Sequence, residues 1–239
     1  MEILITICAR GGSKGIPGKN IKELNGKPLI NYTIDHAKAF AKIYNCDIAL
    51  STDDLKIKVV AASSGLITDY VRPSELASDN AGKIIVIKEL FNYESASRKK
   101  KYDYVLDLDV SAPMRTLEDI VTGFDLLKQT PEAYNIFSVS PAYKNPYFNM
   151  VEPTEDKYFN ISKPLPSQVK SRQQAPQVYQ INGSFYIYTS KFFQDDNLGA
   201  ITKRSLIYIM KHQCFDLDEP LDFEFLEFLV KNNKLDFKI

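Results

Sequence analysis

The sequence is that of a globular protein of 239 residues, long enough for one domain with a substantial buried core. Hydrophobic residues make up 44% and charged residues 25%, and no apolar stretch approaches the about 20 residues that span a bilayer, so we expect a cytoplasmic protein with no membrane partner. The 30 Lys and Arg residues balance the 30 Asp and Glu residues, so no overall field favours nucleic acid, and an anionic ligand must be held by a local cluster.

Short apolar runs rich in β-branched residues alternate with longer segments of helical periodicity in the first half of the chain. This order is typical of βαβ units, in which helical crossovers join parallel strands. It predicts a three-layer α/β/α sandwich with a mostly parallel, Rossmann-like sheet. The expected strands are 3–8, 46–51, 66–71 and 104–110, and the expected helices are 30–43, 55–64, 82–97 and 117–129.

The composition and periodicity of the sequence change between residues 141 and 180, after a further expected strand at 135–140. This segment is rich in Pro, Asn and aromatic residues and has little helical period, so we expect an inserted β-arm. Regular structure returns with expected strands at 181–189 and 205–210 and a last helix at 219–231, so a single domain, 1–239, encloses the arm. Five aromatic residues of the arm have no helical face to join: Tyr143, Tyr147, Phe148, Tyr158 and Phe159. They indicate either a homodimer interface through 141–180 or a lobe that packs on its own domain.

A glycine-rich, basic loop follows the first expected strand. The segment ARGGSKGIPGKN, residues 9–20, contains four glycines and the cations Arg10, Lys14 and Lys19. In open α/β sheets ligands bind beyond the carboxyl ends of the strands, and glycines let backbone N–H groups approach phosphate oxygens. The spacing fits neither GxGxxG nor a P-loop, which argues against a dinucleotide oxidoreductase and a P-loop kinase. The loop predicts a phosphate site, and the alternative is a solvated turn.

Two aspartates, Asp216 and Asp218, lie on a strand-like segment just before the last expected helix. Alternation along a strand would place both on one face, where they could share a Mg²⁺ bound to nucleotide phosphates. The alternative is that Asp218 or Glu219 only caps the helix, and the spacing alone does not decide between the two.

The histidines and cysteines form no catalytic arrangement in the sequence. Because no Ser/His/Asp or Cys/His pattern stands out, His36 and His212 are interpreted as structural. The cysteines Cys8, Cys46 and Cys214 are odd in number and lack CxxC spacing, so we expect reduced thiols.

A series of motifs in this chain follows the order of a known family. ARGGSKGIPGKN and GKPLI (26–30) resemble the opening signature of the acylneuraminate cytidylyltransferases, the CMP-sialic acid synthetases and their legionaminic and pseudaminic acid relatives. The similarity recurs in STDD (51–54), RPSELASDNA (72–81), SAPMR (111–115), RQQAPQVY (172–179), NGSFYIY (182–188) and FDLDEPLDF (215–223). The resemblance implies a nucleotidyltransferase that joins CMP from CTP to a sialic-acid-like sugar acid, with Mg²⁺ as cofactor and a homodimer formed through the arm.

The resemblance also implies a role for each residue that matches the motifs. Arg10, Lys19 and Asp218 would be catalytic, and Asp216 and Asp218 would bind the metal. The nucleotide would be bound by Arg10, Gly11, Gly12, Ser13, Lys19, Asn20, Arg72 and Ala81. Within this set, Arg72 and the backbone at Ala81 would face the cytosine base.

Two departures from the sialic acid pattern concern the sugar. Asp109-Val110 stands where a glutamine–proline pair is usual, and Gln180-Ile181 where an arginine–proline pair is usual. A carboxylate only accepts hydrogen bonds, and loss of the arginine removes a cation, so we expect a sugar other than N-acetylneuraminate. DLDVSAPMR and KNPYFNMVE (144–152) look closer to the legionaminic acid branch, whose sugar offers an extra N–H donor to Asp109. The expected sugar-binding residues are Asp109, Arg172, Gln180 and Tyr186.

Other readings of the same motifs stay open. The same fold could activate N-acetylneuraminate, pseudaminate or the eight-carbon acid KDO. A protein of a different class, a nucleotide-binding regulatory subunit without catalysis, would be expected to lack the metal carboxylates or the loop lysine.

Overall fold

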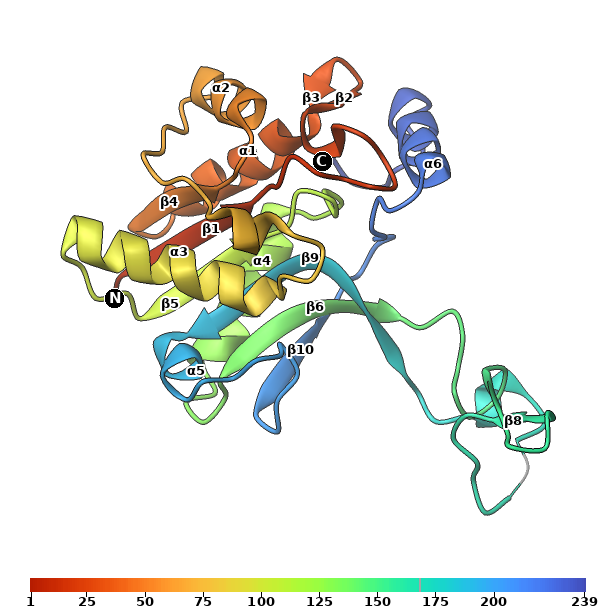
Figure 1. Cartoon of the computed structure of the whole chain (residues 1–239). Helices are drawn as coiled ribbons and strands as arrows, with labels where there is room; N and C mark the ends of the chain where they lie inside the picture. The colour runs from red at the N-terminus through yellow and green to blue at the C-terminus, as the bar shows by residue number, and fades with distance from the viewer. Residues whose placement is uncertain (168) are drawn as a thin grey trace.

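The computed structural model describes residues 1–167 and 169–239 and has one central six-stranded sheet (Figure 1). The strand order is β10-β6-β9-β5-β1-β4. Its strands are β1 (Ile3–Cys8), β4 (Cys46–Ser51), β5 (Tyr104–Leu108), β6 (Asn135–Pro141), β9 (Tyr179–Thr189) and β10 (Ser205–Ile209). Only β9 of these strands is antiparallel to its neighbours, β5 and β6. The mostly parallel sheet is therefore confirmed.

Helices cover both faces of the sheet because the strands are apolar on both sides. In β1, Ile3, Ile5 and Ile7 join one hydrophobic cluster and Leu4 joins another, as expected for side chains that alternate across a strand. The first cluster includes side chains of α1 (Leu29–Ala41), α2 (Leu55–Ser63), α4 (Leu117–Lys128) and α6 (Pro220–Lys231). On the other face lie α3 (Lys83–Arg98) and the short α5 (Ser190–Gln194). The three layers are those that the alternating pattern predicts.

Two of the strands expected for the central sheet differ in the structure. Residues 66–71 do not form a strand: Leu66 and Tyr70 are buried, but the backbone reaches the edge strand β4 without forming a ladder. Apolar spacing there reflects packing of single side chains, which alternation cannot distinguish from a strand. The expected strand 104–110 ends at Leu108, so that Asp109 already belongs to the loop beyond the sheet.

Several short elements were not expected from periodicity. They are the 3-10 turns η1 (Lys19–Ile21), η2 (Ser74–Ala77) and η3 (Arg172–Gln174), and the hairpins β2–β3 (Glu23–Leu24, Lys27–Pro28) and β7–β8 (Val151–Pro153, Phe159–Ile161). Such elements are too short to show a period. The turn η1 matters for function because it begins at Lys19 and so ends the glycine-rich loop.

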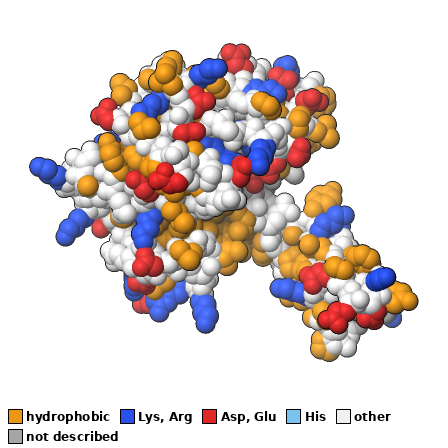
Figure 2. All heavy atoms as spheres, in the orientation of Figure 1, with side chains coloured by type: hydrophobic (Ala, Val, Ile, Leu, Met, Phe, Trp, Pro, Cys, Tyr) orange, Lys and Arg blue, Asp and Glu red, His pale blue; other side chains and the backbone are white. Residues whose placement is uncertain are grey.

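The segment 141–180 leaves the body as a projecting arm (Figure 1). Strands β6 and β9 pair as far as Pro141 and Tyr179, and the chain between them continues outward to the hairpin β7–β8. Figure 2 shows the arm as a separate lobe with hydrophobic side chains on its surface. The exposed side chains include Tyr143, Tyr158 and Phe159. Within the part of the chain that the structure describes, no helix is long and apolar enough to cross a bilayer.

Candidate active site

A cavity of about 280 Å³ lies where the carboxyl ends of β1, β4 and β5 meet. This is the edge at which open α/β sheets bind ligands. Seven residues expected in the site line it: Arg10, Ser13, Lys19, Asn20, Arg72, Ala81 and Asp109. These residues come from three loops far apart in the sequence, and the fold brings them together.

The glycine-rich loop carries its cations to this cavity. Asn20 Nδ2 donates a hydrogen bond to the Arg10 carbonyl oxygen at 2.8 Å, which holds the two ends of the loop together. Arg10 Nη1 and Lys14 Nζ lie 2.7 and 2.5 Å from the two carboxylate oxygens of Asp79. Asp79 therefore neutralises two cations of the loop. A polyphosphate in the cavity would compete with Asp79 for Arg10.

The first two glycines of the loop take different places beside the cavity. The Gly11 N–H donates to Asp53 Oδ1 at 3.0 Å, and a Cβ on Gly11 would lie 2.7 Å from Asp54 Oδ2. Gly11 thus anchors the loop to the turn after β4 and does not line the cavity. Gly12 lines an adjoining hollow with Ser13 and Lys14.

Arg72 is fixed at the end of β4. Its Nε donates to Ser51 Oγ at 2.9 Å and its Nη2 to the Ser51 carbonyl oxygen at 2.8 Å, while its own N–H donates to the Thr52 carbonyl oxygen at 3.0 Å. Only 6% of the residue is exposed, at the cavity wall. A guanidinium held in this way presents its remaining donors in one direction, which suits recognition of a planar, polar group.

The segment that carries Asp216 and Asp218 reaches the same cavity edge from the other end of the chain. Residues 211–219, all described, contain no strand, so the expected strand at this point is wrong. The alternation nevertheless holds, because Leu217 is fully buried between the two aspartates and its N–H donates to the Ser111 carbonyl oxygen at 2.9 Å. This one hydrogen bond fixes the segment to the loop after β5.

Contacts with the glycine-rich loop bring Asp218 next to Lys19. Lys19 Nζ donates to the Leu217 carbonyl oxygen at 2.5 Å and lies 3.6 Å from Asp218 Oδ1. A Cβ on Gly15 would lie 1.9 Å from the Asp218 carbonyl oxygen, so only glycine fits at that crossing. The loop and the aspartates therefore form one unit.

The structure decides whether Asp218 caps α6. Glu219 is the N-cap residue, and Asp222 Oδ2 accepts the N–H groups of Asp218 and Glu219 at 3.0 and 2.7 Å. The side chain of Asp218 is 77% exposed and is not part of this cap. Its carboxylate is therefore free to bind a ligand.

The environment of Asp216 fits a divalent cation. Its Oδ1 is buried and has no hydrogen-bond partner in residues 1–167 and 169–239. Burial raises the pKa of Asp216 to about 7, and the carboxylates of Asp109 and Asp218 add to this effect. No group of three or more His, Cys, Asp or Glu ligands occurs among the described residues. Mg²⁺ commonly takes one or two carboxylates and completes its shell with water and substrate phosphates, so the donor set suits it.

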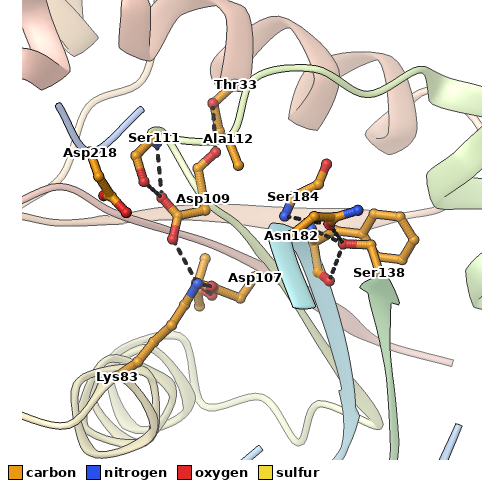
Figure 3. A network of polar contacts seen from close by, with 12 residues as sticks. Thr33, Lys83, Asp107, Asp109, Ser111, Ala112, Ser138, Asn182, Ser184 and Asp218 are labelled. Atoms are coloured by element: carbon orange, nitrogen blue, oxygen red, sulfur yellow. Dashed lines mark hydrogen bonds and ion pairs between the residues drawn. The ribbon is translucent and has the colours of Figure 1, made fainter. Parts of the chain in front are cut away.

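Lys83 is a cavity residue that the sequence did not single out (Figure 3). Its Nζ lies 2.9 Å from Asp107 Oδ2 and 2.8 Å from Asp109 Oδ2, and 4.3 Å from the centre of the Tyr186 ring. Burial alone would lower the pKa of Lys83, but the two carboxylates outweigh it and raise the pKa well above its ordinary value. Its place just after the motif 72–81, at the start of a helix, was the one available signal.

The expected sugar-binding residues separate into two pairs. Asp109 lines the cavity. Tyr186 lies beside Asp109, because β9 pairs Tyr186 with Asp107, two residues before Asp109. Gln180 stands where the arm begins, and its Oε1 accepts the Tyr143 N–H at 3.5 Å. The Arg172 guanidinium lies 5.9 Å from the centre of the Tyr143 ring. Within one chain, Arg172 and Gln180 therefore do not line the cavity.

Neither histidine lines the cavity. His212 Nε2 contacts Asp119 Oδ2 at 2.9 Å, and burial would lower its pKa, but this contact raises it above the ordinary value. His36 Nδ1 contacts the Tyr32 carbonyl oxygen, and burial lowers the pKa of His36 to about 4. Both positions support the structural interpretation. The three cysteines are free thiols, as expected.

A model of the cytidylyltransferase family matches residues 4–236 of this chain. The chain is also 37% identical to the post-translational flagellin modification protein B of Campylobacter coli, over 99% of this chain and 98% of that protein. The chain belongs to the cytidylyltransferase family. As a member, it is a nucleotidyltransferase with the fold that its sheet shows.

Two further proteins resemble this cytidylyltransferase. It is 34% identical to a CMP-N,N′-diacetyllegionaminic acid synthase of Campylobacter jejuni, over 98% of this chain and 97% of that protein. A solved CMP:2-keto-3-deoxy-manno-octonic acid synthetase complexed with CTP matches its fold with a TM-score of 0.69 and 17% identity, over 98% of this chain and 100% of that one. The resemblance to the acylneuraminate branch is thereby confirmed, and the structural likeness confirms the fold.

Proposed function

We propose that this cytidylyltransferase transfers CMP from CTP to the anomeric C2 hydroxyl of a nine-carbon 2-keto sugar acid, with legionaminic acid as the preferred class. The observation that carries the proposal is that Lys19 and Asp218, from opposite ends of the chain, meet at one cavity edge. Nucleotidyl transfer requires, in one site, cations that bind the triphosphate and carboxylates that bind the metal ion. The similarity to a CMP-N,N′-diacetyllegionaminic acid synthase supports this class of sugar.

In the proposed reaction the C2 oxygen forms a bond to the α-phosphorus of CTP, and the bond from that phosphorus to pyrophosphate breaks. The proton of the C2 hydroxyl passes to solvent water. Arg10 and Lys19 stabilise the negative charge on the phosphates and on the leaving pyrophosphate, because both cations face the cavity. Arg72 and the backbone near Ala81 lie on the wall that would receive the cytosine base. Positioning and electrostatics then account for most of the catalysis.

Asp216 and Asp218 would hold Mg²⁺. The buried Oδ1 of Asp216, which has no hydrogen-bond partner among the described residues, and the exposed carboxylate of Asp218 supply the hard oxygen ligands that this ion prefers. When bound, Mg²⁺ would neutralise charge on the triphosphate. The lysine and both aspartates are present, which argues against a regulatory subunit without catalysis.

The sugar would bind beside Asp109. This carboxylate accepts hydrogen bonds only, which favours a sugar that places an N–H or O–H donor there. Legionaminic acid, with an additional acetamido N–H, meets that requirement. N-acetylneuraminate, pseudaminate and KDO are the competing substrates.

The proposed assembly is a homodimer through 141–180. Figure 2 shows hydrophobic side chains both on the arm and on the neighbouring part of the body, and large exposed apolar surfaces favour association. Arg172 and Gln180 would then serve the sugar site of the second copy, since they do not line the cavity of their own chain.

Because the reaction consumes CTP, the cytoplasm is the expected compartment.

The sugar assignment is tested by kinetics on four acids. Pyrophosphate release from CTP is measured with N,N′-diacetyllegionaminate, pseudaminate, N-acetylneuraminate and KDO, with Mg²⁺ and with a chelator. We expect the highest kcat/KM for the legionaminate, by about tenfold or more over N-acetylneuraminate, and no turnover with the chelator. A preference for N-acetylneuraminate would contradict the choice of sugar. An absence of turnover with all four would contradict the proposed function.

A further inference from the structure

Lys83 occupies an unusual place for a lysine. It is the first residue of α3, and its side chain turns to the inside of the molecule, where it is 33% exposed at the cavity. Lys88, on the same helix, shows the ordinary arrangement: it pairs with Asp196 at 2.5 Å, outside this cavity. Burying an ammonium is costly unless it is paired, so the partners of Lys83 explain its position.

The ammonium of Lys83 is held from three sides. Asp107 on β5 lies 2.9 Å away and is itself fixed by Thr6 Oγ1, which donates to Asp107 Oδ1 at 2.9 Å. Tyr186 on β9 lies under the ammonium with its ring centre at 4.3 Å. Both partners belong to the sheet and are buried. The position of the Lys83 charge is therefore set by the rigid part of the fold.

Asp109 is the third partner and the one that faces the cavity. Its Oδ2 pairs with Lys83 at 2.8 Å, and its Oδ1 accepts from the N–H and the Oγ of Ser111 at 2.9 and 2.8 Å. Figure 3 shows Lys83 reaching from α3 to both aspartates. Oδ1 already accepts two hydrogen bonds, whereas Oδ2 accepts one from Lys83 and keeps a second lone pair, so Asp109 can accept one further hydrogen bond but cannot rotate away.

We propose that Lys83 is a positioning residue that determines sugar selectivity: it holds the Asp109 carboxylate as a fixed acceptor, so that the cavity selects a sugar acid with an N–H or O–H donor at that point. This inference rests on the proposed function. The selectivity follows from the geometry, because a ligand that lacks the donor leaves a charged acceptor without a partner in a confined site. A free, rotating carboxylate would adapt to either ligand.

The test uses Lys83→Met, which keeps most of the side-chain length over Tyr186 but removes the ammonium and its charge, and Lys83→Arg, which keeps the charge. Lys88→Met is the matched control on the same helix. Because Lys83→Met leaves Asp107 buried without a cation, the double variant Lys83→Met/Asp107→Asn removes that cost and keeps an acceptor for Thr6. Substrates are the best sugar acid of the wild type and its derivatives methylated singly at each N–H and O–H group.

We expect the wild type to reject one methylated derivative strongly, by about tenfold to a hundredfold in kcat/KM. Lys83→Met and the double variant should raise the KM for the parent sugar by about tenfold and lose discrimination against that derivative, while the KM for CTP changes by less than about threefold. Lys83→Arg should restore most of the discrimination, and Lys88→Met should behave as the wild type.

The outcomes separate this inference from the proposed function. If the wild type turns over no sugar acid, the proposed function fails and this inference fails with it. If the wild type is active but the double variant keeps the full discrimination, Lys83 has a structural role only and the inference is overturned. The same holds if Lys83→Met lowers thermal stability and kcat for all substrates equally.

Discussion

Lys19 is the residue on which the two halves of the site depend. Its side chain is only 13% exposed, and its ammonium contacts the Leu217 carbonyl oxygen as well as the Asp218 carboxylate. It can therefore position the segment that carries the proposed metal ligands and also face the phosphates of CTP in the proposed complex. Asp79 pairs with the other two cations of the loop, Arg10 and Lys14.

Lys19→Ala should lower kcat/KM by about a hundredfold, because it removes a fixed cation that would stabilise the negative charge developing on the phosphates during the transfer. Lys22→Ala is the matched control, since Lys22 lies on the same turn but its ammonium sits over the Phe223 ring. Thermal unfolding should show both variants folded. Pyrophosphate release from the Lys19 variant within about threefold of the wild type would refute its catalytic role.

Single residues of the site were predictable where a motif carries them. Arg10, Lys19 and Arg72 were expected at the cavity, and the structure places them there. Lys83 was not, because its role depends on how α3 docks against β5 and β9, and a lone lysine at a helix start has no signature. The anchoring role of Gly11 was equally hidden, since it depends on Asp53, which lies 42 residues away.

Among the secondary structure elements, the helices and central strands follow from periodicity. The side chains of β1 enter apolar clusters on both faces of the sheet, and a short apolar run of this kind is typical of a fully buried strand. Residues 66–71 show the limit: the same apolar spacing lies beside a sheet edge without forming a ladder. The spacing of apolar residues predicts which side chains are buried. Whether the backbone forms a hydrogen-bonded ladder depends on the strand beside it.

The arm should hold two copies of the chain together. Light scattering on the purified protein should give twice the chain mass of 27.2 kDa. Replacing the exposed Tyr158 and Phe159 by serine should shift the protein toward the monomer, because it removes apolar surface that pairing would bury. Ile67→Ser, at an equally exposed apolar position on the body, serves as the control. A monomer in the unmodified protein at micromolar concentration would contradict the proposed dimer.

The whole molecule has no net charge, yet basic and acidic side chains lie close together around the cavity at one edge of the sheet. Lys19 and Leu217 are 198 positions apart in sequence and in hydrogen-bond contact. The site therefore forms only when the chain is folded. Composition could not reveal this site, whereas the ordered motifs along the chain could. The fold brings both segments to the cavity because β1 lies next to β5 in the sheet and the segment after β10 returns to the loop beyond β5.

Formation of the CMP-sugar itself is the decisive measurement. The protein is incubated with Mg²⁺, N,N′-diacetyllegionaminic acid and each of CTP, UTP, ATP and GTP, and products are identified by mass spectrometry alongside released pyrophosphate. We predict a CMP-sugar and an equal amount of pyrophosphate with CTP, and little product with the other nucleotides. Equal use of all four nucleotides, or no CMP-sugar from any nine-carbon 2-keto acid by a protein that binds CTP, would contradict this account.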